Sequence, residues 1–384
     1  MREFIKVSHP LVGEEEINAV ADVLRTGNYV SGKKVEEFER AFSEYSGTKY
    51  AAAVSSGTAA LHVILASLDI GPGDEVIVPA MTFFSTATSV FHQNAIPVFA
   101  DVDDDYCIDP KSVKEKITDR TKAIIAVHLF GYACQMKELL DISKEHNLYL
   151  IEDCAQAHGT RYHNKTVGSI GIAGAFSFFA TKNMTTGEGG MITTDNEEIY
   201  KLAKLIRSHG MHNRDEHIIL GYNYRMTEME AAMGLVQLKK LEGFNKKRRE
   251  FSFYLYEHIK DIPWIHIQNL SPQIEHSFFW CTIRVDEDKL GMSVSDLVQK
   301  LKGAGIGVRQ RYQEPLYRQS MLINKKIYPK NCPFECQSDR DYDYSEVFLP
   351  NAEKFAGKLI GLPNHQGLSF DELDYIIKTL KEIK

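Results

Sequence analysis

The chain has 384 residues, of which 43% are hydrophobic and 25% are charged, a composition typical of a globular protein. This length is too great for a single small core, so we expect two packed domains. Lys and Arg number 45 against 52 Asp and Glu, giving a net charge of -7. A chain without a basic excess is not expected to bind nucleic acid.

The sequence also argues against a membrane or an exported protein. No apolar run reaches the length of a membrane span, and the first residues lack the apolar core of a signal peptide. The six cysteines are widely spread, so we expect reduced thiols and a cytoplasmic location. Cys332 and Cys336 have no second Cys or His pair nearby at ligand spacing, and we expect no metal.

Between residues 50 and 195, short apolar or β-branched runs alternate with helix-like segments. Seven runs are predicted as strands, at residues 50–55, 75–78, 97–101, 123–127, 148–151, 174–178 and 191–193. Strands that alternate with helices imply a mostly parallel sheet covered on both faces. Because the runs are almost continuously apolar, we expect them to be buried.

The pattern changes after about residue 220. Two long helices are predicted, at residues 226–241 and 245–259, followed by a smaller α+β region. Its expected elements are strands at 278–285 and 306–308 and helices at 294–301 and 371–383, with a loop excursion over 319–345. We therefore predict an N-terminal segment and large α/β domain over residues 1–240 and a small C-terminal α+β domain over 241–384.

One lysine stands among apolar and small residues just before a glycine-rich turn, in Ser177-Phe-Phe-Ala-Thr-Lys182-Asn-Met-Thr-Thr-Gly-Glu-Gly-Gly190. A lysine held away from water loses stabilisation of its ammonium form, so its pKa falls. The free amine of Lys182 can then form a Schiff base with an aldehyde, as lysines do with pyridoxal phosphate (PLP). A lysine taken by itself is more often an ordinary surface residue before a loop, so the interpretation depends on the rest of the chain.

Asp153 ends a predicted buried strand, in Leu148-Tyr-Leu-Ile-Glu-Asp153. In open α/β sheets, ligands collect beyond the carboxyl ends of the strands. A carboxylate there can keep the pyridine nitrogen of PLP protonated, which makes the ring an electron sink. The alternative is that Asp153 only caps the helix that follows.

Two further segments offer contacts for a cofactor. In Ser55-Ser-Gly57-Thr58-Ala-Ala60, small residues join a strand to a helix and let backbone N–H groups approach a phosphate. Ser177 can add another donor. Phe83 follows a strand at the same predicted sheet edge, where an aromatic ring either stacks on a cofactor or packs in the core.

Three other segments match nucleotide or calcium motifs only in part. The run Gly27-Asn-Tyr-Val-Ser-Gly32-Lys33 is like a P-loop, but Lys34 replaces the Ser or Thr that holds magnesium, and no strand precedes it. Ser169 occupies the first glycine position of a dinucleotide-like run at 168–174. The acidic run at 101–105 lacks the glycine and glutamate of a calcium loop. We expect none of these ligands.

Together and in this order, the motifs resemble the DegT/StrS family of PLP-dependent sugar aminotransferases. The matching segments are Gly27-Asn-Tyr-Val-Ser-Gly32, Ser56-Gly-Thr-Ala59, Glu152-Asp-Cys-Ala-Gln-Ala-His-Gly159, the stretch 177–190, Gly221-Tyr-Asn-Tyr-Arg-Met-Thr-Glu228 and Leu362-Pro-Asn-His365. The resemblance covers nearly the whole chain. It implies the PLP-dependent transferase fold type I, aspartate aminotransferase-like, with a mostly parallel seven-stranded sheet in the large domain and a smaller C-terminal α+β domain.

The resemblance also implies roles for particular residues. Lys182, bonded to the cofactor, and Asp153, paired with its pyridine nitrogen, would be catalytic. The cofactor-binding residues would be Gly57, Thr58, Phe83, Asp153, Gln156, Ser177, Lys182 and, toward the neighbouring subunit's cofactor, Asn223. The role of Asn223 implies a homodimer with shared active sites. The substrate candidates are Tyr29, His158, Arg225, Arg309, Arg311 and Tyr312.

The implied reaction moves an amino group from L-glutamate to a keto-sugar. The leading interpretation is a nucleotide-linked keto-hexose, in amino-sugar and surface polysaccharide biosynthesis. One alternative is a non-nucleotide acceptor, such as an octulosonate derivative, another sugar acid or aldehyde, or a cyclitol; another is a regulatory homologue without catalysis. In a few relatives histidine replaces the lysine and the enzyme dehydrates sugars, so Lys182 favours transamination.

The chain departs from the family pattern in the small domain, where a His–Tyr pair is usual and Arg311-Tyr312 stands here. Arg309 and Arg311 can form bidentate hydrogen bonds with a carboxylate or pyrophosphate. They can equally form a solvated face. The sequence favours neither anion binding nor a solvated face over the other.

Overall fold

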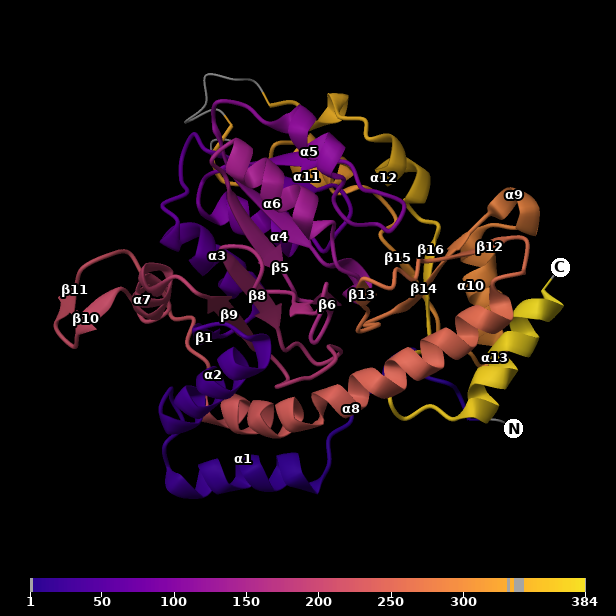
Figure 1. Cartoon of the computed structure of the whole chain (residues 1–384), viewed down its shortest axis with the longest axis horizontal. Helices are drawn as coiled ribbons and strands as arrows, with labels where there is room; N and C mark the ends of the chain where they lie inside the picture. Colours follow the sequence, from indigo (N-terminus) through magenta and orange to yellow (C-terminus); the bar gives the residue numbers. More distant parts are fainter. Residues whose placement is uncertain (1–2, 330–331, 335–341, 384) are drawn as a thin grey trace.

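The computed structural model describes residues 3–329, 332–334 and 342–383, and its largest element is a seven-stranded sheet (Figure 1). The strand order is β1 (Tyr50–Val54), β9 (Gly190–Thr194), β8 (Ala173–Ser177), β5 (Tyr149–Asp153), β4 (Thr121–Val127), β2 (Glu75–Pro79) and β3 (Ile96–Ala100). Strand β9 is antiparallel to both of its neighbours, β1 and β8, and all other adjacent strands of the sheet are parallel. The predicted mostly parallel seven-stranded sheet is confirmed, and each strand forms within two residues of its expected ends.

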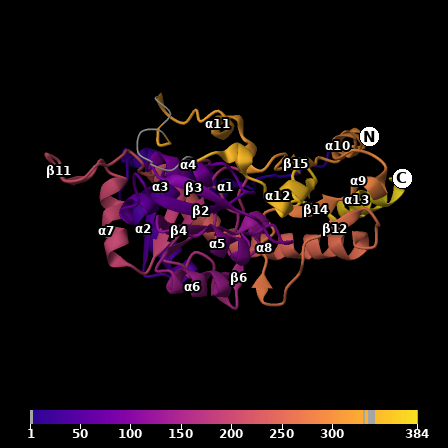
Figure 2. The ribbon, with the colours of Figure 1, turned by 90° about the horizontal axis from the view of Figure 1, so that it is seen from above.

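Helices cover both faces of this sheet (Figure 2). One face packs on α3 (Gly57–Ser67), α4 (Ser85–His92) and α7 (Glu197–Ile206). The other packs on α2 (Lys33–Ser46), α5 (Pro110–Lys116) and α6 (Met136–Glu145). Alternate residues of each strand enter the two cores, as in β1, where Ala52 and Val54 face one way and Ala51 and Ala53 the other. Both faces of the sheet are therefore buried, which explains why the strand sequences are continuously apolar.

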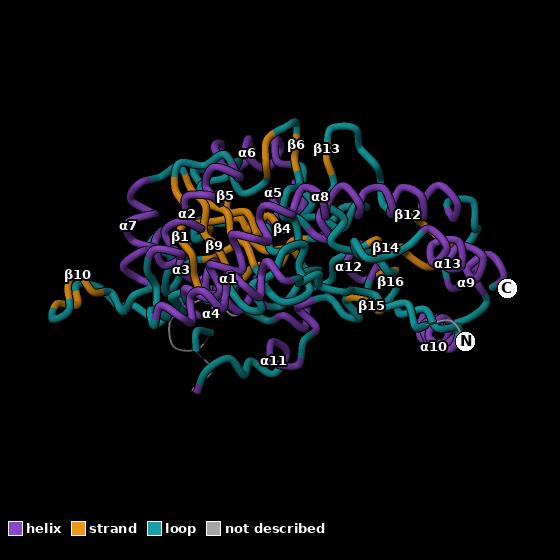
Figure 3. The backbone as a smooth tube through the Cα atoms, turned by 90° about the horizontal axis from the view of Figure 1, so that it is seen from below, coloured by secondary structure: helices purple, strands orange, loops and turns teal. Residues whose placement is uncertain are grey.

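A second sheet of four antiparallel strands forms the centre of the small domain, beside the C-terminal helix (Figure 3). Its order is β12 (Ile265–Ile267), β14 (Cys281–Val285), β16 (Leu359–Leu362) and β15 (Arg309–Arg311). Helices α10 (Val294–Gly303) and α13 (Phe370–Glu382) share its apolar core. The strand expected at 306–308 lies three residues later, because Ile306 instead pairs with Ile5 of the N-terminal segment.

The remaining elements are short, apart from α1. They are α1 (Glu14–Thr26), β6 (Arg161–Tyr162), β7 (Lys165–Thr166), β10 (Met211–Asn213), β11 (Glu216–His217), β13 (Ile274–Glu275), α9 (Glu287–Leu290), α11 (Ser320–Ile323) and α12 (Pro350–Phe355). Strands β10 and β11 form a hairpin that projects from the large domain (Figure 1).

A single helix, α8 (Glu228–Ile259), stands where two helices were expected. It has 32 residues and begins with a capping box between Thr227 and Glu230. Gly243, at the expected break, continues the helix and has open space where a side chain would project. Because α8 contributes Leu241 to a large-domain core and Leu255 to the small-domain core, it joins the two (Figure 1). The boundary predicted at residues 240–241 lies inside this helix and stays a prediction.

The cysteines differ in part from expectation. Cys107, Cys134, Cys154 and Cys281 are free and buried, whereas Cys332 is disulfide-bonded. The prediction of reduced thiols is therefore wrong for Cys332, while Cys336 lies outside the described residues.

Among the helices of the described segments, none combines the length and apolar character that crossing a membrane requires.

Two glycines of α8 provide a matched test of its packing. A Cβ at Gly234 would lie 2.7 Å from the buried ring of Phe38, whereas one at Gly243 would meet nothing within 4 Å. We expect Gly243→Ala to raise the free energy of unfolding by up to about 1 kcal/mol through helix propensity. Gly234→Ala should lower it by about 1–3 kcal/mol through overpacking. Thermal unfolding of the two variants in parallel checks this; shifts of the same sign would contradict it.

Candidate active site

A cavity of about 370 Å³ lies at the carboxyl ends of the parallel strands, between the large sheet and the small domain. The predicted residues that line it are Gly57, Thr58, Phe83, Asp153, Gln156, Ser177, Lys182, Arg309, Arg311 and Tyr312. Segments more than 250 residues apart in the sequence, such as those of Gly57 and Arg309, thus meet at one site. This is the position where open α/β sheets bind ligands.

Lys182 lies in the turn that follows β8. Its backbone N–H donates to the Phe179 carbonyl at 2.9 Å, and its amine is 4.6 Å from the centroid of the Phe279 ring. Burial lowers the pKa of Lys182 to about 8, with Asp153 opposing this change and the positive Arg311 adding to it. At pH 7 about a tenth of the amine is therefore uncharged, far more than at the ordinary lysine pKa, and is available as a nucleophile or base.

Asp153 is the last residue of β5 and is only 6% exposed. Its carboxylate accepts hydrogen bonds from the Thr86 hydroxyl at 3.0 Å and the Ala155 N–H at 3.1 Å. Burial raises the pKa of Asp153, while these two donors and the charge of Lys182 oppose the rise. The result is a fixed carboxylate that a cationic ligand group would satisfy.

The first turn of α3 forms one wall of the cavity, with Ser56 as N-cap. The Ser56 hydroxyl accepts from the Ala59 N–H at 3.1 Å, and Thr58 donates to the Ser85 hydroxyl at 2.9 Å. A Cβ at Gly57 would lie 2.7 Å from the Cβ of Ser177, so only glycine fits between helix and strand. A helix N-terminus lined by small residues and hydroxyls is suited to an anion such as phosphate.

Gln156 and Tyr312 connect the two domains across the cavity. The Gln156 side-chain carbonyl accepts from the Phe130 N–H at 3.0 Å, and its amide donates to the Tyr312 hydroxyl at 3.1 Å. Tyr312 adopts a φ of +44°, in the left-handed region that side chains other than glycine rarely adopt. Such strain often marks functional positions, and here it turns the Tyr312 ring toward Gln156.

Arg311 and Trp280 form the small-domain wall. The guanidinium centre of Arg311 is 3.8 Å from the centroid of the Trp280 ring, and its buried Nε has no hydrogen-bond partner in the described part of the chain. Burial lowers the pKa of Arg311 to about 10, and Arg309 nearby adds to this effect. A cation that lies against an aromatic ring and lines the cavity is suited to bind a carboxylate or phosphate.

Sequence reasoning missed several residues of this cavity. Phe279, Trp280, Thr86 and Glu188 line it but were not predicted. The one available signal was the aromatic run Phe278-Phe-Trp280, which was interpreted only as the start of a strand. Nothing local marks Thr86 or Glu188, because their relevance depends on how distant elements pack.

Four predicted site residues lie outside the cavity of this chain. Tyr29 and Asn223 are exposed, and Arg225 is half-buried on the same loop as Asn223. His158 is fully buried against the rings of Phe176 and Phe178, and burial lowers its pKa to about 3. Because His158 lies behind the cavity wall, the geometry does not support the predicted contact with substrate.

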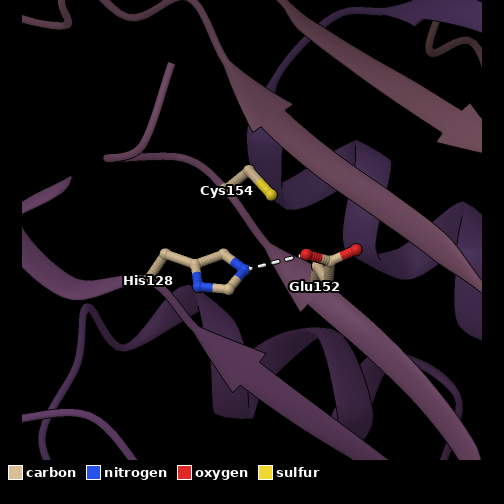
Figure 4. A group of neighbouring side chains, drawn as sticks. All are labelled: His128, Glu152 and Cys154. Carbon is tan, nitrogen blue, oxygen red and sulfur yellow. Dashed lines mark hydrogen bonds and ion pairs between the residues drawn. The ribbon is translucent and has the colours of Figure 1, made fainter. Parts of the chain in front are cut away.

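A buried cluster next to the site has the composition of a metal centre (Figure 4). His128 lies 3.0 Å from Glu152, with Cys154 beside them. The other ring nitrogen of His128 accepts from a backbone N–H, and the Glu152 carboxylate accepts from three more at 2.7–2.8 Å.

Since these hydrogen bonds use both nitrogens of His128 and all strong acceptor positions of Glu152, the cluster fits a structural role better than metal ligation. It fastens the end of β4 to β5 and to the loop at residues 168–171. The backbone N–H of His128 also donates to the Asp153 carbonyl at 3.1 Å. The cluster thereby fixes the strand end that carries Asp153.

The comparisons with known proteins agree with this geometry. The model of the DegT/DnrJ/EryC1/StrS aminotransferase family matches residues 10–381. The chain belongs to this family. It is 36% identical over 394 residues to the spore coat polysaccharide biosynthesis protein SpsC of Bacillus subtilis, covering 99% of this chain and 97% of SpsC.

Two solved structures are similar over almost their whole length. PseC of Helicobacter pylori, an aminotransferase involved in the biosynthesis of pseudoaminic acid, is 29% identical with a TM-score of 0.88, and the match covers 100% of this chain and 99% of PseC. Spr1654 of Streptococcus pneumoniae, in its PLP form, is 32% identical with a TM-score of 0.87, covering 99% and 98%. Spr1654 is also known in a PMP form.

This family member is therefore a transaminase with PLP as its cofactor, of the predicted PLP-dependent transferase fold. The cavity fits that cofactor on three independent counts. The amine of Lys182 has a lowered pKa, and the carboxylate of Asp153 is buried. The first turn of α3 presents backbone N–H groups suited to an anion, and only glycine fits at position 57.

The electrostatics of Lys182 lead to a prediction for the cofactor-free protein. Its amine should react with 5-deoxypyridoxal, an aldehyde without a phosphate, at a rate that is half-maximal near pH 8. Asp153→Asn removes an opposing negative charge and should move this midpoint to lower pH, whereas Arg311→Ala should move it to higher pH. The visible absorbance of the adduct, followed against pH, measures all three. A wild-type midpoint above pH 10 would show a solvated amine.

Proposed function

We propose that this transaminase moves the amino group of L-glutamate to a keto-sugar, with a nucleotide-linked keto-hexose as acceptor, in amino-sugar and surface polysaccharide biosynthesis. The observation that carries the proposal is the pairing of the reactive Lys182 with the cationic Arg309–Arg311 wall in one cavity. Two relatives act in related chemistry, since SpsC is named for spore coat polysaccharide and PseC for pseudoaminic acid.

In this proposal, one end of the cavity holds the cofactor. Asp153 would hold the pyridine nitrogen, Gln156 and Phe83 would contact the ring, and Gly57, Thr58 and Ser177 would bind the phosphate; all six residues line the cavity. When bound, PLP supplies an electron sink that stabilises negative charge at the carbon next to the transferred nitrogen. The buried Asp153 carboxylate is suited to hold a protonated nitrogen because its two hydrogen-bond donors and Lys182 favour its charged form.

Lys182 is proposed as the proton carrier. Its Nζ removes the proton from the α-carbon of glutamate and, in the second half of the reaction, delivers a proton to the corresponding carbon of the acceptor. A base with a pKa of about 8 is close to working pH in both directions. The rings of Phe279 and Trp280 make this side of the cavity apolar.

Arg309 and Arg311 are proposed to bind an acidic group on the acceptor. The guanidinium group of Arg311 lies against the Trp280 ring, and both residues line the cavity. A nucleotide-linked sugar carries phosphates that match this arrangement. A carboxylate on a free sugar acid would match it too, so the acceptor experiment includes both.

We also propose a homodimer with shared active sites. Asn223 and Tyr29 are exposed and do not line the cavity of their own chain. Large apolar side chains are exposed on nearby loops and on the cavity rim, among them Val30 at 71% and Leu220 at 78%. Covering them with a second copy would bury apolar surface and bring Asn223 to the phosphate of the neighbouring cofactor.

The two half-reactions test the proposal directly. L-glutamate should convert the PLP form to the amine form, seen as loss of visible absorbance. After removal of the donor, a nucleotide-linked keto-hexose should restore that absorbance. Recovery only with a free sugar acid or aldehyde would contradict the nucleotide-linked acceptor, and failure of glutamate to bleach the absorbance would contradict the donor.

The arginine wall leads to a separate prediction. Arg311→Ala should raise the acceptor KM by roughly 10- to 100-fold, since a charge-assisted hydrogen bond contributes about 1.5–3 kcal/mol. The rate of the glutamate half-reaction should change less than the acceptor KM, and its pH profile should move to higher pH because the positive charge that lowers the pKa of Lys182 is gone. Arg318→Ala is the matched control, because Arg318 pairs with Glu353 at 2.9 Å outside the cavity. An unchanged acceptor KM in Arg311→Ala would remove the proposed role.

A further inference from the structure

Among the described residues, the buried side chain of Glu228 forms no ion pair with a lysine or arginine and binds backbone N–H groups instead. It is 6% exposed, and its carboxylate accepts from the N–H groups of Gly32 at 2.9 Å, Lys34 at 3.0 Å and Val35 at 2.9 Å. These groups begin α2, whose N-cap Gly32 provides no side-chain cap of its own. Glu228, almost 200 residues away in sequence, therefore caps α2.

This contact explains the P-loop-like run at residues 27–33. Its glycines and the helix start that follows do form an anion-binding arrangement of backbone N–H groups. The anion is the Glu228 carboxylate of the same chain, which is why no phosphate is needed there. The run is a structural joint between the starts of α2 and α8.

Two other hydrogen bonds strengthen the same joint. The Glu228 N–H donates to the Tyr29 carbonyl at 3.1 Å, and the Ser31 hydroxyl donates to the Met226 carbonyl at 3.0 Å. We call residues 27–32 and 221–227 the paired loops. They carry Tyr29, Asn223 and Arg225, which were predicted at an active site but do not line the cavity of their own chain.

We propose that Glu228 is a positioning residue that holds the paired loops for the active site of the second subunit. The proposal rests on the shared-site homodimer proposed above. Without the carboxylate, three N–H groups lose their acceptor, and the loops lose the link that fixes Tyr29 and Asn223 relative to each other. The defect then appears in the partner's site, where Asn223 contacts the phosphate.

Loss of the Glu228 carboxylate can also disturb the phosphate-binding segment of the same subunit. The paired loops touch their own phosphate cradle, because the Ser55 N–H donates to the Tyr224 carbonyl at 2.8 Å and Val54 pairs with Arg225. The experiment must therefore separate an effect on the partner from an effect on the same chain. Hybrid dimers with one reactive Lys182 do this.

The variant is Glu228→Gln, which keeps the size of the side chain but turns an NH₂ toward a backbone N–H. In hybrid A, one chain carries Glu228→Gln and the other Lys182→Ala. In hybrid B, one chain carries both changes and the other is wild type. The reference hybrid pairs wild type with Lys182→Ala, so that each dimer has a single reactive site. Differently tagged chains allow the hybrids to be isolated.

We expect hybrid A to match the reference and hybrid B to lose about tenfold in rate, consistent with loss of charge-assisted hydrogen bonds. Hybrid B should also release its cofactor faster on dilution, seen as loss of the visible absorbance. Loss in hybrid A alone, equal loss in both, or no loss in either would overturn the positioning role.

Two controls keep this result separate from other failures. Glu230→Gln changes the local capping box of α8 and should leave both hybrids at the reference rate. Asn223→Ala, placed in the same two hybrids, tests the shared site itself. If Asn223→Ala acts on its own chain, the shared-site proposal fails regardless of Glu228. If Glu228→Gln chains form no dimer, Glu228→Asp, a shorter carboxylate, replaces it, and rescue of hybrid B by that variant supports the role.

Discussion

The active site depends on the burial of one amine between charges of opposite sign. Lys182 is buried at the cavity with Asp153 and Arg311 as its charged neighbours, and burial outweighs the carboxylate in setting its pKa near 8. If the cavity were open, the amine would be protonated and inert; if Asp153 were absent, the cationic form would become rarer still. The rest of the site is an arrangement that keeps these three groups in place.

That arrangement requires two domains, because the groups come from both. Asp153 and Lys182 follow strands of the large sheet, whereas Arg311 belongs to β15 of the small sheet. The hydrogen bond from Gln156 to Tyr312 fixes one sheet edge against the other, and α8 passes through both cores. Small rotations between the domains would therefore change the electrostatics at Lys182 directly.

The sequence predicted well where information is local. All seven strands of the large sheet were readable because buried parallel strands are continuously apolar. Lys182 and Asp153 were readable because they follow such strands. The break predicted in α8 failed because Gly243 is tolerated in a helix that long-range packing stabilises. Trp280 was missed, and His158 lies behind the cavity wall and not in it, because whether a side chain faces a cavity depends on distant elements.

The N-termini of α2 and α3 also show that a local sequence pattern does not reveal what binds there. Both α3 and α2 begin after small residues, and both present backbone N–H groups suited to an anion. The start of α3 lines the cavity, while the start of α2 is occupied by the Glu228 carboxylate. The glycine pattern is compatible with either outcome. Whether a helix N-terminus can bind an external anion depends on whether the fold places one of the chain's own carboxylates there. For α2 that carboxylate belongs to Glu228, almost 200 residues away in the sequence.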